Sequence, residues 1–239
     1  MQKIKHLFRQ MFRMTTPVAI ILAAIILSAS HVAYGVIVSS GSSSTPTTAF
    51  KGRAIDATDF PTGKEKAKVF LVEYSDTECP FCAQVHPTLQ KIKQEYASKL
   101  GFVYRYFPLT QIHPGAFEEA RAVYCVGKTS GGEKLQSYVN ELFSYKLEKQ
   151  NMVLPKGMKE TMAKNIGVNE TEFASCMQSQ ESKDAIDASI QDGVAAGVQG
   201  TPASFVLIKT KKGYETVSLV DGARPYEFFK AVIDDALAR

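Results

Sequence analysis

The feature that most constrains this chain is a pair of cysteines, Cys79 and Cys82, set between a strand pattern and a helix pattern. Residues 68–75 (KVFLVEYS) are a dense run of β-branched and aromatic residues, which predicts a strand. A helical pattern follows from Phe81 to about Leu100, and Pro80 stands in its first turn, where proline is tolerated. The two cysteines are therefore expected to open a helix directly after a strand.

This position suits a redox-active thiol pair. Unpaired backbone N–H groups and the helix dipole stabilise a thiolate at a helix start, so Cys79 is the expected nucleophile. Cys82 lies nearly one turn further on, close enough to attack a mixed disulfide, and is the expected resolving thiol. The alternative is half of a zinc site, which normally needs a second such pair or two histidines. Only His86 is near in sequence, so we favour the redox pair and expect no metal.

Two further positions fit this chemistry. Glu73 lies in an otherwise apolar run, six residues before Cys79. We expect a half-buried carboxylate with a raised pKa that moves the proton of Cys82; the alternative is a solvent-facing charge. Thr201 and Pro202 precede a returning strand, where a cis proline facing the thiols would let Thr201 offer its backbone to an extended substrate. The alternative there is an ordinary trans turn.

The order of the remaining elements predicts an α/β fold. A second strand is expected at 101–107, a block of helices from about 114 to 198, a hairpin with strands 203–209 and 215–220, and a closing helix at 225–238. A β-α-β unit, then inserted helices at about 114–180, then a hairpin and a helix is the thioredoxin-like layout.

The first fifty residues read as a targeting segment and a tether. A basic tail (1–16), expected in the cytoplasm, precedes an apolar run over 17–38. We interpret this run as a transmembrane anchor, with a cleaved signal peptide as the alternative. Residues 39–52 are expected to be a flexible linker, and 53–239 the folded domain. Both interpretations place this domain outside the cytoplasm.

The net charge of +4 comes from this segment alone. Residues 1–50 hold four basic residues and no acidic one, so the remaining 24 basic residues balance the 24 acidic ones. A neutral domain gives no electrostatic reason to expect nucleic acid as a partner.

The chain resembles the DsbA-like branch of the thioredoxin superfamily. The resemblance is carried by four stretches: 72–89 (VEYSDTECPFCAQVHPTL), 103–116 (VYRYFPLTQIHPGA), 122–125 (AVYC) and 197–206 (GVQGTPASFV). It implies a thioredoxin core with a helical insertion, an active cysteine pair at Cys79 and Cys82, an acid at Glu73 and a cis proline at Pro202. Many strong oxidases of this family carry a histidine where this chain has Phe81.

The other candidate residues have less specific patterns. Export, together with similar pairs in relatives, favours a structural disulfide between Cys125 and Cys176 over two separate buried thiols. Pro80 and Phe81 are expected to contact substrate with Thr201 and Pro202. Phe107 and Tyr124 are groove or core residues, His86 and His113 are interpreted as structural, and Arg105 as a surface or edge residue.

Three functional hypotheses follow. In the first, an extracytoplasmic enzyme donates its Cys79–Cys82 disulfide to exported proteins and is recycled by a membrane redox partner. In the second, the enzyme is a reductase or isomerase. In the third, the domain is a non-catalytic metal- or protein-binding module. No cofactor is expected, because the cysteines carry the electrons.

Overall fold

The computed structural model describes residues 47–64 and 66–239. The expected basic tail (1–16), the anchor or signal segment (17–38) and most of the expected linker lie outside the described residues. Within the described ranges, no helix combines the length and the apolar character needed to cross a membrane.

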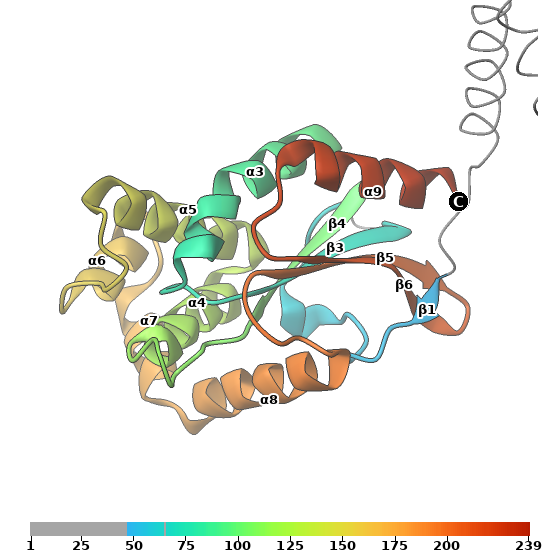
Figure 1. Cartoon of the computed structure of the whole chain (residues 1–239). Coiled ribbons are helices and arrows are strands. Elements are labelled where there is room, and N and C mark those ends of the chain that lie inside the picture. Colours follow the sequence, from blue (N-terminus) through green and yellow to red (C-terminus); the bar gives the residue numbers. More distant parts are fainter. Residues whose placement is uncertain (1–46, 65) are drawn as a thin grey trace, which may run out of the picture. The chain divides into compact units, whose positions relative to one another are not determined.

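A mixed sheet of six strands forms the centre of the described part of the chain (Figure 1). Its strands lie in the order β1-β6-β5-β3-β4-β2. They are β1 (Thr48–Ala49), β2 (Thr62–Gly63), β3 (Val69–Ser75), β4 (Leu100–Tyr106), β5 (Ala203–Thr210) and β6 (Gly213–Asp221). β3 is parallel to β4 and antiparallel to β5, and β5 pairs with β6 as a hairpin. The predicted strands are all present, while the short edge strands β1 and β2 carry no pattern that predicted them.

Helices cover both faces of this sheet. They are α3 (Pro80–Tyr96), α4 (Ala116–Ser130), α5 (Gly132–Lys149), α6 (Met158–Asn165), α7 (Glu170–Gln178), α8 (Gln180–Ala196) and α9 (Tyr226–Ala238). α3 and α9 lie on one face and α8 on the other, with α4 to α7 grouped beyond one end of the sheet (Figure 1). The expected thioredoxin-like α/β fold with inserted helices is confirmed.

Alternation along the central strands divides the core into two parts. On β3, Val69 and Leu71 pack with residues of α3 and α9, whereas Phe70, Val72 and Tyr74 pack on the α8 face. The same alternation places Glu73 and Ser75 on the α3 face. Because α3 begins at the end of β3, its first residues lie close to these two side chains.

The fold begins earlier than the sequence pattern indicates. The prediction of a linker over 39–52 is wrong for its last residues, because β1 pairs with β6. Phe50 packs its ring against Phe205, with 5.2 Å between the ring centroids. A two-residue edge strand is too short to leave a period in the sequence.

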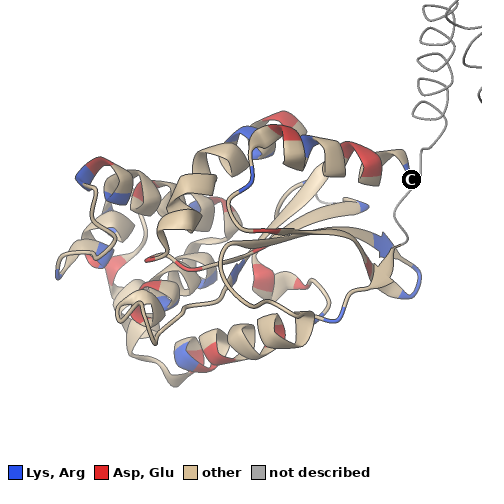
Figure 2. Ribbon diagram, in the orientation of Figure 1, with Lys and Arg blue, Asp and Glu red and all other residues tan. Residues whose placement is uncertain are grey.

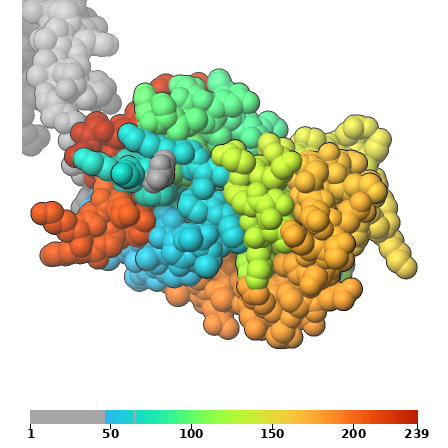
Figure 3. Space-filling view, turned by 180° about the vertical axis from the view of Figure 1, so that it is seen from behind, coloured from blue at the N-terminus to red at the C-terminus, as the bar shows by residue number. Residues whose placement is uncertain are grey.

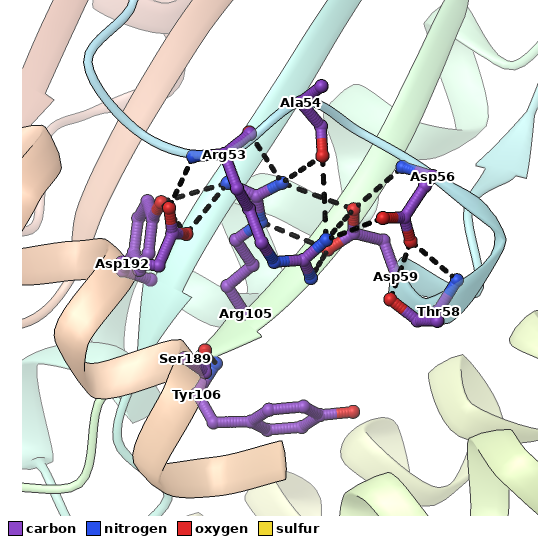
Figure 4. A network of polar contacts seen from close by, with 10 residues as sticks. Arg53, Ala54, Asp56, Thr58, Asp59, Arg105, Tyr106, Ser189 and Asp192 are labelled. Atoms are coloured by element: carbon purple, nitrogen blue, oxygen red, sulfur yellow. Dashed lines mark hydrogen bonds and ion pairs between the residues drawn. The ribbon is translucent and has the colours of Figure 1, made fainter.

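Arg105 is the clearest correction. It is 1% exposed, not a surface or edge residue. Its guanidinium pairs with Asp59 of the 3-10 helix η1 (Ala57–Asp59) at 3.0 Å and with Asp192 of α8 at 2.9 Å. It also donates a hydrogen bond to the Tyr74 hydroxyl at 2.9 Å. Figure 4 shows this network, in which Arg53 contacts both acids as well. Local sequence does not show that η1 and α8 cover this strand.

Charged residues are mixed over the described surface. Figure 2 shows basic and acidic positions interspersed along the helices rather than gathered in a stretch of one sign. This mixture agrees with the balanced charge of the chain beyond residue 50. It gives no electrostatic support for a polyanionic partner.

Candidate active site

Cys79 and Cys82 lie at the junction between the sheet and the inserted helices. Cys79 is the N-cap residue of α3, Pro80 occupies the first turn, and Cys82 lies inside the helix. Cys79 is 3% exposed and Cys82 is fully buried, and their sulfurs are not bonded to each other. Both belong to an apolar cluster that includes Val123 of α4 and Leu142 of α5.

The surroundings of Cys79 favour its thiolate. Its pKa is lowered to about 5, mainly by a hydrogen bond from Cys82, while burial opposes this shift. Thr201 and the backbone N–H groups of Phe81 and Cys82 add to the lowering. These N–H groups have no partner within the helix, because they lie in its first turn. At neutral pH the Cys79 sulfur is therefore ionised.

Cys82 has the opposite character. Burial raises its pKa well above the ordinary value, and the Cys79 and Glu73 charges raise it further. The two thiols thus differ as a nucleophile and a resolving thiol must. One sulfur is ionised at neutral pH, and the other holds its proton.

Thr201 and Pro202 face Cys79 from the start of β5. The peptide bond between them is cis. The Cys79 sulfur lies 3.4 Å from the Thr201 carbonyl oxygen, to which only the protonated thiol can donate. The Pro202 carbonyl accepts from the backbone N–H of Gly222 at 2.9 Å, which ties this turn to the end of β6. The structure thus brings together residues more than a hundred positions apart in sequence.

Glu73 lies on the α3 face of β3. At 3% exposure its carboxyl group is more buried than the half-buried position expected, and the alternative of a solvent-facing charge is wrong. Burial raises its pKa, while the Lys93 charge and the Ser75 hydroxyl oppose this shift. Glu73 in turn raises the pKa of Cys82, so the two groups are electrostatically linked.

Lys93 is a residue of this site that the sequence reading missed. Burial lowers its pKa, and Glu73 opposes the shift. Its Nζ donates to Gln136 Oε1 of α5 at 2.5 Å. A signal exists in retrospect, because Lys93 lies four residues after Leu89 and three before Tyr96, which are both buried.

The loop before Cys79 is held by charged groups. Asp76 accepts from the backbone N–H of Leu109 at 2.7 Å and contacts His113 Nδ1 at 2.8 Å. The Lys146 ammonium, fully buried in α5, donates to the Thr77 carbonyl at 2.9 Å and pairs with Glu119. These contacts fit the structural interpretation of His113. Lys146 and Glu119 were not predicted, since each reads as an ordinary helix-surface charge.

The candidate aromatic and histidine side chains divide into exposed and buried ones. Phe81 is 59% exposed beside the thiols. Phe107 and Tyr124 are buried and belong to the core. His86 is buried, its Nε2 lies 2.9 Å from Asn140 Oδ1, and burial lowers its pKa to about 4. It is a packed neutral residue at neutral pH.

The second cysteine pair forms a bond. Cys125 of α4 and Cys176 of α7 are joined by a disulfide with 5.6 Å between their Cα atoms. Cys125 is fully buried within the inserted helices. Within residues 47–64 and 66–239, no group of three or more His, Cys, Asp or Glu side chains is arranged to hold a metal ion.

A cysteine pair at a helix start that faces a cis proline, with helices inserted between β4 and β5, is the arrangement of a DsbA-like protein. A family model described as thioredoxin matches residues 56–235. BdbD from Bacillus subtilis superposes with a TM-score of 0.66, at 17% identity, over 80% of this chain and 99% of that one. The thiol-disulfide exchange protein alpha-DsbA2 from Wolbachia pipientis gives a TM-score of 0.63, at 19% identity, over 75% of this chain and 88% of that one.

The chain therefore belongs to the thioredoxin family. Its fold is similar to that of the solved BdbD and alpha-DsbA2 structures. It is also 32% identical over 168 residues to the Na(+)/H(+) antiporter NhaA 1 of Mycobacterium sp. (strain KMS), over 66% of this chain. The chain spans only about a quarter of the length of the curated relatives it matches, with 25% of that protein covered. The names of these relatives state antiport activity. A match to a quarter of their length does not assign that activity to this chain.

Proposed function

We propose that this chain is an extracytoplasmic thiol-disulfide oxidoreductase that introduces disulfides into exported proteins through Cys79 and Cys82. The observation that carries the proposal is the contrast between the Cys79 pKa of about 5 and the raised pKa of Cys82. A low pKa makes Cys79 a good leaving group and stabilises the reduced protein, which makes the disulfide more oxidising.

The reaction runs in two exchanges. A substrate thiolate attacks Cys79 Sγ, the Cys79–Cys82 bond breaks, and Cys82 leaves and takes up a proton. A second substrate thiolate then attacks the substrate sulfur of the mixed disulfide, and Cys79 leaves as a thiolate. The substrate dithiol loses two electrons and two protons. The protein gains both electrons and one proton, as a Cys82 thiol and a Cys79 thiolate, and the second proton goes to solvent. A membrane redox partner then reoxidises the pair.

The proposal gives each surrounding residue a role. Glu73, the buried acid, supplies the proton to Cys82. Thr201 lends its carbonyl to an extended substrate next to Pro202, and the exposed Phe81 contacts apolar substrate side chains beside Pro80. The cysteines carry the electrons, so the proposal needs no cofactor.

The location outside the cytoplasm has two supports. Residues 17–38 are apolar and follow a basic tail. The Cys125–Cys176 disulfide is of a kind that persists mainly in oxidising compartments.

The test is the redox equilibrium of Cys79 and Cys82 in the full chain against graded glutathione buffers, read by thiol alkylation and mass spectrometry. We expect a potential of about −120 to −150 mV, in the range of strong oxidases. A lower potential would overturn the donor direction and favour the reductase or isomerase alternative, for which Phe81 in place of histidine is the supporting observation. A thiol titration unchanged by chelator is expected, and a chelator-dependent one would favour the metal-binding module.

A further inference from the structure

The loop that joins β3 to Cys79 consists of Asp76, Thr77 and Glu78, and all three residues are buried. A buried polar or charged group costs free energy unless it is bonded. Each of these residues bonds to the part of the chain that follows β4 and forms the inserted helices. Figure 3 shows the inserted helices, coloured from yellow-green to orange, gathered at one side of the view. The position of Cys79 therefore depends on contacts outside the strand and the helix that flank it.

The two acids of this loop bind the connection between β4 and α4. Asp76 accepts from the backbone N–H of Leu109 at 2.7 Å, and Glu78 accepts from that of Gly115 at 2.9 Å. Gly115 directly precedes α4, and a Cβ atom built on it would lie 2.4 Å from Glu78 Oε1. The loop thus approaches the start of α4 more closely than a side chain at this position would allow.

Lys146 of α5 holds the middle residue of the loop. Its ammonium is fully buried and donates to the Thr77 carbonyl at 2.9 Å and to Glu119 of α4 at 2.5 Å. Burial lowers the pKa of Lys146, while Glu119 and the two acids of the loop oppose this shift. Removing an ammonium from water is costly, and a neutral amide could bond to one carbonyl at lower cost. The ammonium differs in that it joins α4, α5 and the loop at a single point.

The charge on Cys79 depends on where its sulfur lies. The Cys79 backbone N–H donates to the Asp76 carbonyl at 3.1 Å, which closes the loop into a turn with Thr77 as one of its central residues. The pKa of Cys79 is lowered mainly by a hydrogen bond from the Cys82 thiol, and the backbone N–H groups of Cys82 and Phe81 add to this lowering. The effect of a helix start on a charge falls off within one turn. A shift of the loop would therefore move the sulfur away from the groups that stabilise its charge.

We propose that Lys146 is a positioning residue for the nucleophile. By holding the Thr77 carbonyl, it keeps Cys79 at the start of α3, so that the inserted helices set how oxidising the thiol pair is. The inference rests on the proposed function and adds to it a contact through which the insertion acts on the thiols. Lys146 acts on the sulfur through the loop, not by contact with substrate.

A purely structural role is the alternative. Lys146 would then only join α4 to α5, and its loss would lower the stability of the protein without changing the thiols. Lys134 of the same helix offers a matched comparison, because its ammonium donates to the carbonyl of Ile166, the C-cap residue of α6. This bond is of the same kind, but it joins two parts of the insertion.

The test compares Lys146→Met with Lys134→Met in the full chain. The pKa of Cys79 is measured in the reduced protein from the pH dependence of its alkylation by iodoacetamide, and the redox equilibrium is measured against graded glutathione buffers. We expect Lys146→Met to raise this pKa by about one unit, because the sulfur loses part of its contact with the helix start. A less favoured thiolate makes the reduced pair less stable, so the equilibrium constant should change about tenfold, or about 30 mV toward a more reducing potential. Lys134→Met should change this constant less than about twofold.

A second comparison separates the carbonyl contact from the unpaired acid that Lys146→Met leaves at Glu119. In the Glu119→Gln background, Lys146→Met should shift the equilibrium constant by the same factor, and this pair of variants carries the test if Lys146→Met alone fails to fold. A shift that disappears in this background would overturn the positioning role. A Lys146→Met protein that unfolds at lower urea but keeps the wild-type Cys79 pKa and redox equilibrium would overturn it as well.

Failure of the proposed function has a different signature. A wild-type protein that fails to exchange disulfides with a dithiol peptide would overturn the proposed function itself. The alkylation measurement needs no exchange partner, so it still decides the role of Lys146 in that case.

Discussion

The two faces of the central strands differ in whether their buried polar groups are hydrogen-bonded. On the α8 face, Tyr74 and Arg105 join Asp59 and Asp192 in a network in which the acids and the guanidinium are paired. On the α3 face, one residue away along the same strands, Glu73 and Tyr104 keep polar atoms without a hydrogen bond in the described part of the chain.

This difference distinguishes residues that stabilise the fold from residues that take part in thiol exchange. On the α8 face, a network of paired charges holds η1 and α8 on the sheet, and its charged groups are already bonded to one another. A buried carboxyl group with a raised pKa costs stability, but it can exchange a proton with a neighbouring thiol. We therefore expect substitutions on the α8 face to change folding and those on the α3 face to change exchange.

Replacement of the nucleophile has the largest expected effect. Cys79→Ser should reduce disulfide exchange to background, because an alcohol at this site neither ionises nor bonds to sulfur. The free energy of unfolding should change by no more than about 1 kcal/mol. Both are measured on one preparation, by exchange with a dithiol peptide and by urea unfolding. Residual exchange above one hundredth of wild type would remove Cys79 from the proposed role.

Arg105→Met should have the largest effect on stability. It leaves the buried Asp59 and Asp192 without their main partner, which costs about 3–5 kcal/mol. Urea unfolding of the disulfide-intact protein measures the loss. The matched control is Arg224→Met, at an exposed arginine, which should cost less than about 1 kcal/mol. Similar losses in both variants would contradict the distinction between the two faces.

Glu73→Gln should slow exchange by roughly 10- to 100-fold, because the proton donor for Cys82 is lost. Its effect on stability depends on pH. Glu73 has a raised pKa in the folded protein, so its contribution is fully present below the ordinary pKa of 4.5 and falls as pH rises above it. The variant should lack this decline between pH 5 and 8, when urea unfolding of both proteins is compared. Identical pH profiles for the two proteins would argue against a raised Glu73 pKa.

Phe81→His has the smallest expected effect. A histidine at this exposed position can donate a hydrogen bond to the Cys79 thiolate, which favours the reduced pair. The redox equilibrium constant should change up to about tenfold, which corresponds to about 30 mV toward a more oxidising potential. Phe81→Leu, which has no hydrogen-bonding side-chain group, is the control and should leave the potential within about 10 mV. A shift of equal size in both variants would show that bulk, not hydrogen bonding, sets the potential.

Much of the fold could be predicted from local pattern. The dense apolar run at 68–75 predicts β3, and the proline after Cys79 marks the start of α3. The helical periods over 114–198 predict the helices α4 to α8. The short strands β1 and β2 could not be predicted, because two residues carry no period. The cysteine pair and the cis proline were found from the sequence, since turn and cap residues mark such positions.

The sequence by itself determined which elements form and where the thiol pair lies along the chain. Only the tertiary structure decided which buried charges meet: Arg105 with Asp59 and Asp192, Lys93 with Glu73, and Lys146 with the loop before Cys79. The physical reason is the distance along the sequence over which each effect acts. Propensity and period act over a few residues, whereas the burial of a charge depends on which distant segment covers it and what partner that segment brings.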